Sequence, residues 1–146
     1  MIAARDKYSN SAVSVHSRGF QYTVMNGYTL SLAFGWGNYC SNRNTRWKLG
    51  DVDKLGQRLE SPDFELAVFY PNGEFVDLSG GSPGGEQVIG YVPASALPML
   101  ISAIKLWPEP EELVGAPLRA RCKQLRLVVE DHQAKIEKEQ EDGRVE

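Results

Sequence analysis

The chain of 146 residues has few of the residues on which small proteins rely for covalent or metal cross-links. It contains two cysteines, Cys40 and Cys122, and two histidines, His16 and His132. Two cysteines are too few for a disulfide scaffold or a structural zinc site, and the four residues show no ligand-like spacing. We therefore expect neither a metal nor a cofactor.

Long apolar runs and phosphate-loop motifs are lacking as well. No run approaches the roughly 20 apolar residues that a membrane-spanning helix needs, and the first ten residues lack the apolar core of a secretory signal. The glycine-rich run 79–85 is followed by Glu86 and a strand-like segment, whereas a phosphate loop needs Gly-Lys-Ser/Thr opening a helix. These absences predict a cytoplasmic protein with no membrane partner.

The net charge of −3 is unevenly distributed along the chain. Residues 1–58 carry eight Lys or Arg and three acids, residues 59–114 carry one Lys and nine acids, and residues 115–146 carry seven of each sign. The acidic middle would repel phosphate, so general nucleic-acid binding is not expected. The arrangement favours head-to-tail contact between subunits and hence a homo-oligomer; the alternative is that both signs are ordinary solvated surface.

The first two thirds of the chain read as antiparallel sheet. Asn26-Gly27 predicts a type I′ turn between two alternating segments, and Pro71-Asn72-Gly73 predicts a second hairpin turn. The segments expected to be strands are 12–17, 20–25, 28–34, 64–70, 75–78 and 86–92.

From residue 93 the pattern becomes helical. We expect one helix over about 95–107, with Ser95 as its cap and Pro98 tolerated in its first turn, and a second over about 117–141. The apolar positions of the second helix form a heptad seam: Leu118, Cys122, Leu125, Val129, His132 and Ile136. Residues 142–146 are expected to be a frayed acidic tail. The prediction is a single α+β domain over 1–146, with an N-terminal antiparallel sheet of five or six strands (12–92) followed by a C-terminal helical hairpin.

A long irregular stretch, 35–63, follows the best predicted strand and carries the candidate site. Trp36 and Tyr39 offer faces for nucleobase stacking, Arg43 and Arg46 can pair with phosphate, and Asn38 can hydrogen-bond a base edge. The alternative is that the aromatic residues close one end of the sheet.

A second basic cluster lies on the long helix, where Arg119, Lys123 and Arg126 share one face. Such a face can clamp an anion, or it can be a solvated surface beside the seam. No residue is expected to be catalytic, because Cys40 would need a nearby base and His132 falls in the seam. The expected ligand-binding residues are Trp36, Asn38, Tyr39, Arg43, Arg46, Arg119 and Lys123.

The run from Val24 to Arg43, with its Asn-Gly-Tyr-Thr hairpin leading into Phe-Gly-Trp-Gly-Asn-Tyr-Cys, resembles the core of a group of small bacteriophage proteins. Residues 90–101 resemble the start of a helix in the same group. A sheet followed by two helices is also similar in architecture to the phage Thoeris anti-defence sponges. That resemblance implies an oligomer that binds cyclic ADP-ribose-type signals between its subunits without cleaving them.

These observations lead to one main hypothesis and two alternatives. The main hypothesis is a phage counter-defence protein that sequesters a cyclic nucleotide immune signal without cleaving it. The first alternative is a protein-binding inhibitor of a host defence complex such as CRISPR, acting through the acidic middle segment. The second, an enzyme that cleaves the same signals, is disfavoured because both histidines have structural explanations.

Overall fold

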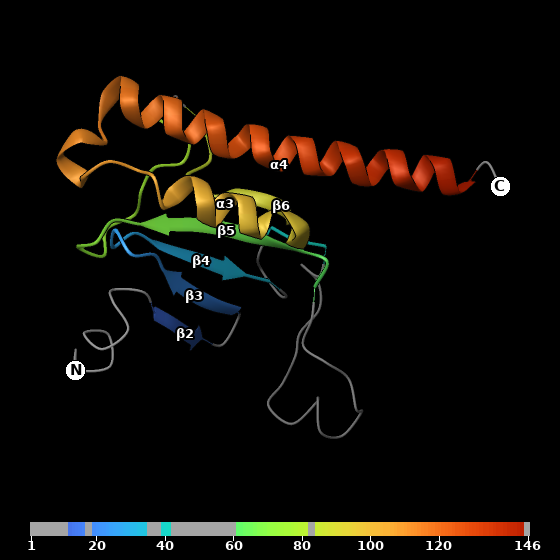
Figure 1. Ribbon diagram of the computed structural model, residues 1–146, viewed down its shortest axis with the longest axis horizontal. Helices are drawn as coiled ribbons and strands as arrows, with labels where there is room; N and C mark the ends of the chain where they lie inside the picture. The colour runs from blue at the N-terminus through green and yellow to red at the C-terminus, as the bar shows by residue number, and fades with distance from the viewer. Residues whose placement is uncertain (1–11, 17–18, 35–38, 42–60, 82–83, 145–146) are drawn as a thin grey trace.

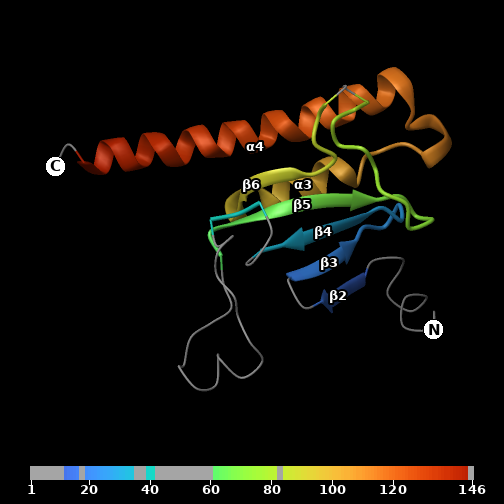
Figure 2. The ribbon, with the colours of Figure 1, turned by 180° about the vertical axis from the view of Figure 1, so that it is seen from behind.

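The computed structural model describes residues 12–16, 19–34, 39–41, 61–81 and 84–144. Within these ranges the chain forms an α+β fold, with an antiparallel sheet first and a long helix last, as the sequence predicts (Figure 1). The helices α3 and α4 lie on the same face of the sheet, which the reverse view confirms (Figure 2). The C-terminal end of α4 extends beyond the sheet (Figure 1).

The sheet is a meander in which each strand pairs antiparallel with the next along the chain. Residues paired across neighbouring strands point to the same face, so the row Tyr22, Leu30 and Val68 faces the helices. Thr23 pairs with Thr29 on the opposite face, where their hydroxyls lie 2.8 Å apart. The strands are β2 (Ala12–His16), β3 (Gly19–Thr23), β4 (Thr29–Ala33), β5 (Asp63–Phe69) and β6 (Ile89–Pro93).

The helical layer contains one short and one long α-helix. A 3-10 turn, Ala94–Ala96, leads from β6 into α3, Leu97–Ile104. A second 3-10 turn, Pro110–Glu112, precedes α4, Gly115–Arg144. The predicted helical hairpin is not confirmed. The helix α3 has 8 residues and α4 has 30, so α3 is too short to pack along most of α4.

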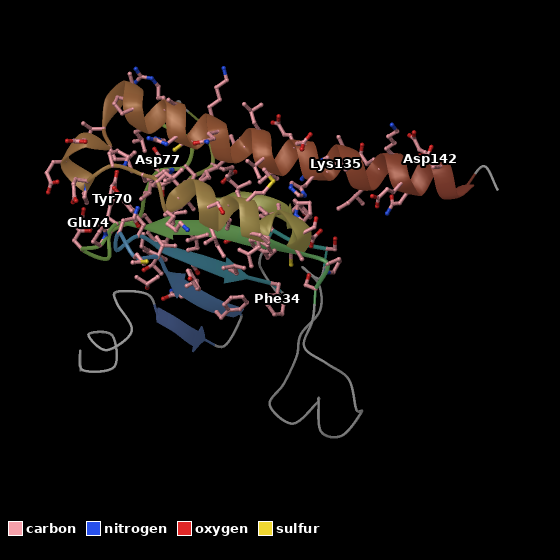
Figure 3. All side chains as sticks on the ribbon, in the orientation of Figure 1. Phe34, Tyr70, Glu74, Asp77, Lys135 and Asp142 are labelled. Atoms are coloured by element: carbon pink, nitrogen blue, oxygen red, sulfur yellow. The ribbon has the colours of Figure 1, made fainter. Side chains whose placement is uncertain are left out.

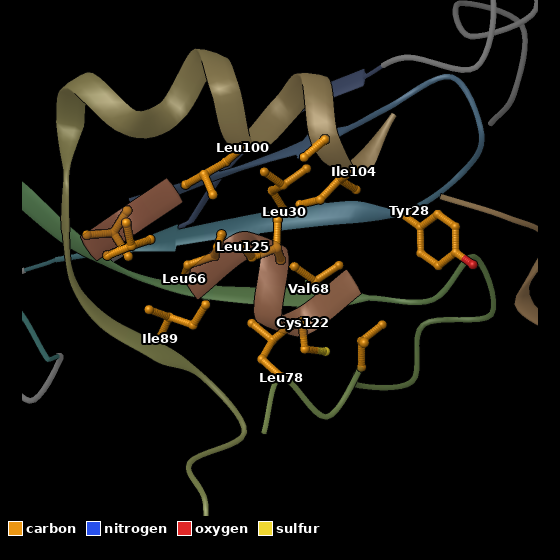
Figure 4. Close-up of a cluster of buried hydrophobic side chains, with 14 of the residues drawn as sticks. Tyr28, Leu30, Leu66, Val68, Leu78, Ile89, Leu100, Ile104, Cys122 and Leu125 are labelled. Carbon is orange, nitrogen blue, oxygen red and sulfur yellow. The ribbon is translucent and has the colours of Figure 1, made fainter. Parts of the chain in front are cut away.

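The core lies between the sheet and the two helices (Figure 4). Leu30, Leu66 and Val68 from the sheet are fully buried against Leu100 and Ile104 of α3. The first half of the predicted seam closes the same core with three buried residues: Cys122, Leu125 and Val129. The seam prediction therefore holds for that half, whereas Ile136 at its far end is 37% exposed.

The predicted strand over 75–78 is wrong. Phe75 makes only an isolated bridge with Phe69, and the chain then leaves the sheet. Val76 and Leu78 are fully buried and join the core that α3 and α4 cover. The apolar alternation of this segment reflects burial under the helices rather than strand pairing.

The predicted type I′ turn at Asn26-Gly27 is also wrong. Gly27 has a φ of +93°, but Asn26 is not among the described residues with positive φ, whereas a type I′ turn needs positive φ at both positions. The connection is a three-residue loop in which Gly27 N–H donates to Val24 O over 2.9 Å and Val24 N–H donates to Tyr28 O over 2.8 Å. The turn at Gly73 repeats both bonds between the corresponding residues.

The helix ends differ from the prediction at three points. Ser95 is not a helix cap, because α3 begins at Leu97 after Ala96 and has no side-chain cap; Pro98 does lie in its first turn. Residues 142–144 of the predicted frayed tail belong to α4, while 145–146 lie outside the described residues. Among the helices that the structure describes, none combines the length and the apolar character needed to cross a membrane.

Candidate functional site

The most distinctive backbone feature of the described chain is a bulge in β6. Phe64 pairs with Val92 and Leu66 with Ile89, so the two residues Gly90 and Tyr91 stand opposite the single residue between them on β5. Tyr91 has a φ of +53°, which costs a non-glycine residue on the order of 1–3 kcal/mol. Bulges of this kind redirect side chains and occur frequently beside functional sites.

Two hydrogen bonds to other segments hold the bulge. Tyr91 N–H donates to Tyr39 O over 2.8 Å, and Gln133 of α4 donates its Nε2–H to Tyr91 O over 2.9 Å. Gly90 lets the two segments approach, since a Cβ at this position would lie 2.6 Å from Tyr39 Cβ. The strained conformation of Tyr91 is therefore fixed from both sides.

The segment 39–41 is anchored across β5 as well. Tyr39 N–H donates to Glu65 Oε2 over 2.8 Å, and Ser41 donates from its main-chain N–H and its hydroxyl to the two oxygens of Asp63. Cys40, between them, is buried. Tyr39, one of the predicted ligand-binding residues, is thus held beside the bulge with 36% of its surface exposed.

A groove of about 550 Å³ lies between this end of the sheet and the second half of α4. Its lining includes Ser41, Asp63, Tyr91, Gln133, Ile136 and Glu137. The side chain of Tyr91 is 45% exposed and offers an aromatic face, and the polar residues offer amide and carboxylate groups to hydroxyl and amine donors. None of the described residues that line the groove is Lys or Arg, so these residues provide no cation for a phosphate. We call this the bulge groove.

The predicted ligand-binding residues are not all brought together. Trp36, Asn38, Arg43 and Arg46 lie outside the described residues. Arg119 and Lys123 are exposed on α4, and no ion pair joins either of them to a carboxylate in the described ranges. Arg119 is 14 residues from Gln133 along α4, which corresponds to about 21 Å at the helical rise. Within one chain, Arg119 therefore lies far from the bulge groove.

Arg126, the third member of the predicted basic face, has a structural role. Its Nη2 donates to Leu78 O over 3.1 Å and to Glu86 O over 3.2 Å, so it fastens the glycine-rich connection onto α4. The amino-acid pattern of α4 gave no sign of this role, because the acceptors are main-chain carbonyls of a distant loop. By contrast, the isolated Gly90 in a strand-like run is a typical sign of a bulge.

Ser95, in the 3-10 turn before α3, faces His132 of α4. Ser95 Oγ lies 3.3 Å from His132 Nδ1, and His132 Nε2 lies 3.3 Å from Met99 Sδ. A nucleophile–base pair needs a third group to orient the base, but here the second ring nitrogen faces a thioether. We interpret His132 as a packing residue between α3 and α4.

Nucleophilic and metal chemistry find little support in the described residues. Burial raises the pKa of the Cys122 thiol to about 11, although the nearby Arg126 opposes this shift; such a thiol is not activated. No group of three or more His, Cys, Asp or Glu side chains in the described part of the chain is placed to hold a metal ion.

Comparison of the chain with protein-family models, with curated proteins and with solved structures found no match.

Proposed function

We propose that this protein binds a cyclic nucleotide immune signal and sequesters it uncleaved, as a bacteriophage counter-defence protein in the cytoplasm of the infected host. The observation that carries the proposal is the bulge groove, over which the strained backbone of Tyr91 holds an exposed aromatic ring. A strained residue is kept where the surrounding structure fixes it, and such residues cluster at ligand sites. Sequestration needs a fixed binding surface and no nucleophile.

The bulge groove suits the nucleoside part of such a ligand. The Tyr91 ring can stack on a base, which contributes roughly 1–3 kcal/mol per base. The Oε1 atom of Gln133 can accept a hydrogen bond from a base amino group, and Glu137 can accept one from a ribose hydroxyl. Ser41 already bonds both oxygens of Asp63, whereas no ion pair engages Glu137 within the described ranges.

The phosphate of the ligand must be bound by cations from outside this lining. Arg43 and Arg46 follow Ser41 by two and five residues in the sequence, and they remain the predicted phosphate contacts. Arg119 and Lys123 lie 14 and 10 residues from Gln133 along α4, which corresponds to about 21 Å and about 15 Å, so we propose that they act from a second copy. This supports a homo-oligomer with the ligand between subunits, which is the arrangement that the sponge resemblance implies.

One experiment separates the candidate functions. The purified protein is incubated with a panel of cyclic dinucleotides and cyclic ADP-ribose isomers, removed by filtration, and then heat-denatured to release what it holds. The proposal predicts depletion of one signal from solution and its recovery intact after heating. Recovery of an altered product would indicate an enzyme. No depletion of any signal would contradict the proposal.

A second candidate function is inhibition of a host defence complex, such as a CRISPR complex, through protein contact. One observation favours it: Glu109, Glu111 and Glu112, three acids of the segment 59–114, are exposed on the connection between α3 and α4. That surface lies at the opposite end of the sheet from the bulge groove.

A further inference from the structure

The connection between α3 and α4, Lys105–Val114, is clamped to the sheet by three side chains. Asn26 Nδ2 donates to the main-chain oxygens of Ile104 over 2.9 Å and Lys105 over 3.2 Å. Tyr28 Oη donates to Pro108 O over 2.7 Å, and Tyr70 Oη donates to Leu113 O over 3.4 Å. We call this connection the clamped loop.

Aromatic rings anchor the clamped loop, one from the loop itself and two from the sheet side. Trp107 is 4% exposed and meets the Tyr28 ring edge to face at a centroid distance of 5.3 Å. The Tyr28 and Tyr70 rings lie 6.0 Å apart, and Leu113 is fully buried. Figure 3 places Tyr70 and Glu74 at this end of the molecule. A loop held in this way loses little conformational entropy on binding a partner.

Exposed apolar side chains stand directly beside the buried anchors. Leu106 precedes Trp107 and is 70% exposed, and Val114 follows Leu113 and is 59% exposed. Met25, the neighbour of Asn26 in the β3–β4 turn, is 57% exposed. Because the neighbours of these residues in the sequence are fixed, the backbone that carries each exposed apolar side chain is preorganised.

The same surface is acidic. Glu109, Glu111 and Glu112 are exposed on the clamped loop and Glu74 is exposed on the nearby turn, whereas the described range 105–114 contains one cation, Lys105. No ion pair neutralises any of these four carboxylates within the described ranges. A surface that carries several unneutralised carboxylates attracts a basic partner and increases its association rate.

We propose that the clamped loop, with Met25, is a docking surface for a partner protein whose contact region is basic around an apolar centre. Charge complementarity selects this occupant over an acidic or neutral one. The proposal deepens the second candidate function, which uses the same acidic connection, and it does not rest on nucleotide binding in the bulge groove at the opposite end of the sheet. A clustered basic surface is typical of proteins that bind nucleic acid, and the acidic charge of the clamped loop is complementary to such a surface.

The test uses two peptide probes and measures their fluorescence anisotropy. One probe is an amphipathic leucine/lysine helix, and the other is a lysine/glutamine peptide of equal charge without leucine. We expect the leucine/lysine probe to bind more tightly. The paired substitutions Leu106→Ser and Val114→Ser should weaken it by about tenfold, because apolar anchors at the centre of an interface dominate the affinity. The melting temperature should stay unchanged, since both side chains are exposed.

Matched variants on α4 keep the result interpretable. Leu127→Ser removes a side chain that is 54% exposed elsewhere, and it should leave the affinity within about twofold of wild type. Glu109→Gln with Glu111→Gln and Glu112→Gln should weaken binding, while Glu139→Gln with Glu141→Gln and Asp142→Asn, which are exposed on α4, should not. Two results would overturn the proposal in favour of unspecific charge attraction. One is an equal loss of affinity in the loop and α4 charge variants, and the other is equal affinity of the wild-type protein for both probes. A dimer that the loop variants abolish would identify a second copy as the occupant and would also overturn it.

Discussion

The side-chain amide of Gln133 in α4 donates a hydrogen bond to the main-chain oxygen of Tyr91 over 2.9 Å. This bond connects the long helix to the bulge in β6. The opposite side of Tyr91 is bonded through its N–H to Tyr39 O. The bulge groove therefore contains parts of three segments that lie far apart in the sequence, and its shape depends on contacts that none of them makes alone.

Replacing Gln133 by Leu should lower the free energy of unfolding by about 0.5–1.5 kcal/mol, the net contribution of a hydrogen bond whose partner is left unpaired. Gln140→Leu is the matched control, because Gln140 lines the same groove and is exposed without a described hydrogen bond. Urea unfolding of both variants measures the difference. Equal midpoints for the two would show that the bond to Tyr91 does not stabilise the bulge.

Asn26 serves as a cap for the C-terminal end of α3, because its amide satisfies carbonyls that the helix leaves unpaired. Asn26→Ala should therefore cost about 1 kcal/mol of stability. Asn72→Ala, in the turn with the same backbone bonds, removes only an exposed bond to Glu74 N–H and should cost less than about 0.5 kcal/mol. Thermal unfolding of the pair tests this, and a larger effect at Asn72 would refute the capping role.

The glycines of the two turns have similar backbone conformations and different surroundings. Gly27 has a φ of +93° and Gly73 a φ of +90°. A Cβ at Gly27 would lie 3.0 Å from Pro71 Cγ, whereas a Cβ at Gly73 meets nothing within 4 Å. Gly73→Ala should thus cost about 1 kcal/mol from backbone strain alone, and Gly27→Ala should cost more.

Gly27→Val adds β-branching to the same strain and should lower stability by roughly 1–3 kcal/mol. Chemical denaturation of the three glycine variants gives the order directly. If Gly73→Ala lowered the free energy of unfolding at least as much as Gly27→Ala, the contact between Gly27 and Pro71 would not contribute to stability.

The protonation state of Cys122 makes stability depend on alkaline pH. Burial raises its pKa in the folded protein from 9.0 to about 11, so above pH 9 the unfolded chain loses its proton first. The stability that this thiol contributes is present below pH 9 and is lost as the pH rises towards about 11. Burial likewise raises the pKa of Tyr28 from 10.0 to about 12, which extends the loss to higher pH.

Urea midpoints measured below pH 9 and near pH 10 test this expectation. Cys122→Ala should be less stable than wild type at the lower pH, because it leaves a cavity, but its stability should fall less between the two values. A parallel fall in both proteins would show that the thiol does not titrate as its burial implies.

The sequence predicts the fold class well because both layers have strong periodicity. The alternation over 28–34 and the apolar spacing from Leu118 to Val129 match what the structure buries. The errors occur where tertiary contacts override local pattern. Val76 and Leu78 alternate because α4 covers them, and Ser95 faces His132 instead of capping a helix.

The candidate site is harder to predict, since its geometry comes from long-range contacts. Tyr39 is an aromatic residue of the long irregular stretch 35–63, which marked it as a ligand-binding residue, and the structure places it beside the bulge. Tyr91 and Gln133 have no local feature that distinguishes them from other exposed residues of a strand and a helix. Only the pairing of β5 with β6 and the packing of α4 bring them together.

The central claim is that Tyr91 binds the base of a captured nucleotide, and titration calorimetry of two variants tests it most directly. The ligand is the nucleotide that the capture experiment identifies. Tyr91→Gly removes the ring and relieves the positive φ, so it should fold at least as stably as wild type yet bind about tenfold more weakly. Phe75→Ala removes another exposed ring, one that packs on Phe69, and should bind like wild type. A folded Tyr91→Gly protein that binds the nucleotide with wild-type affinity would contradict the account.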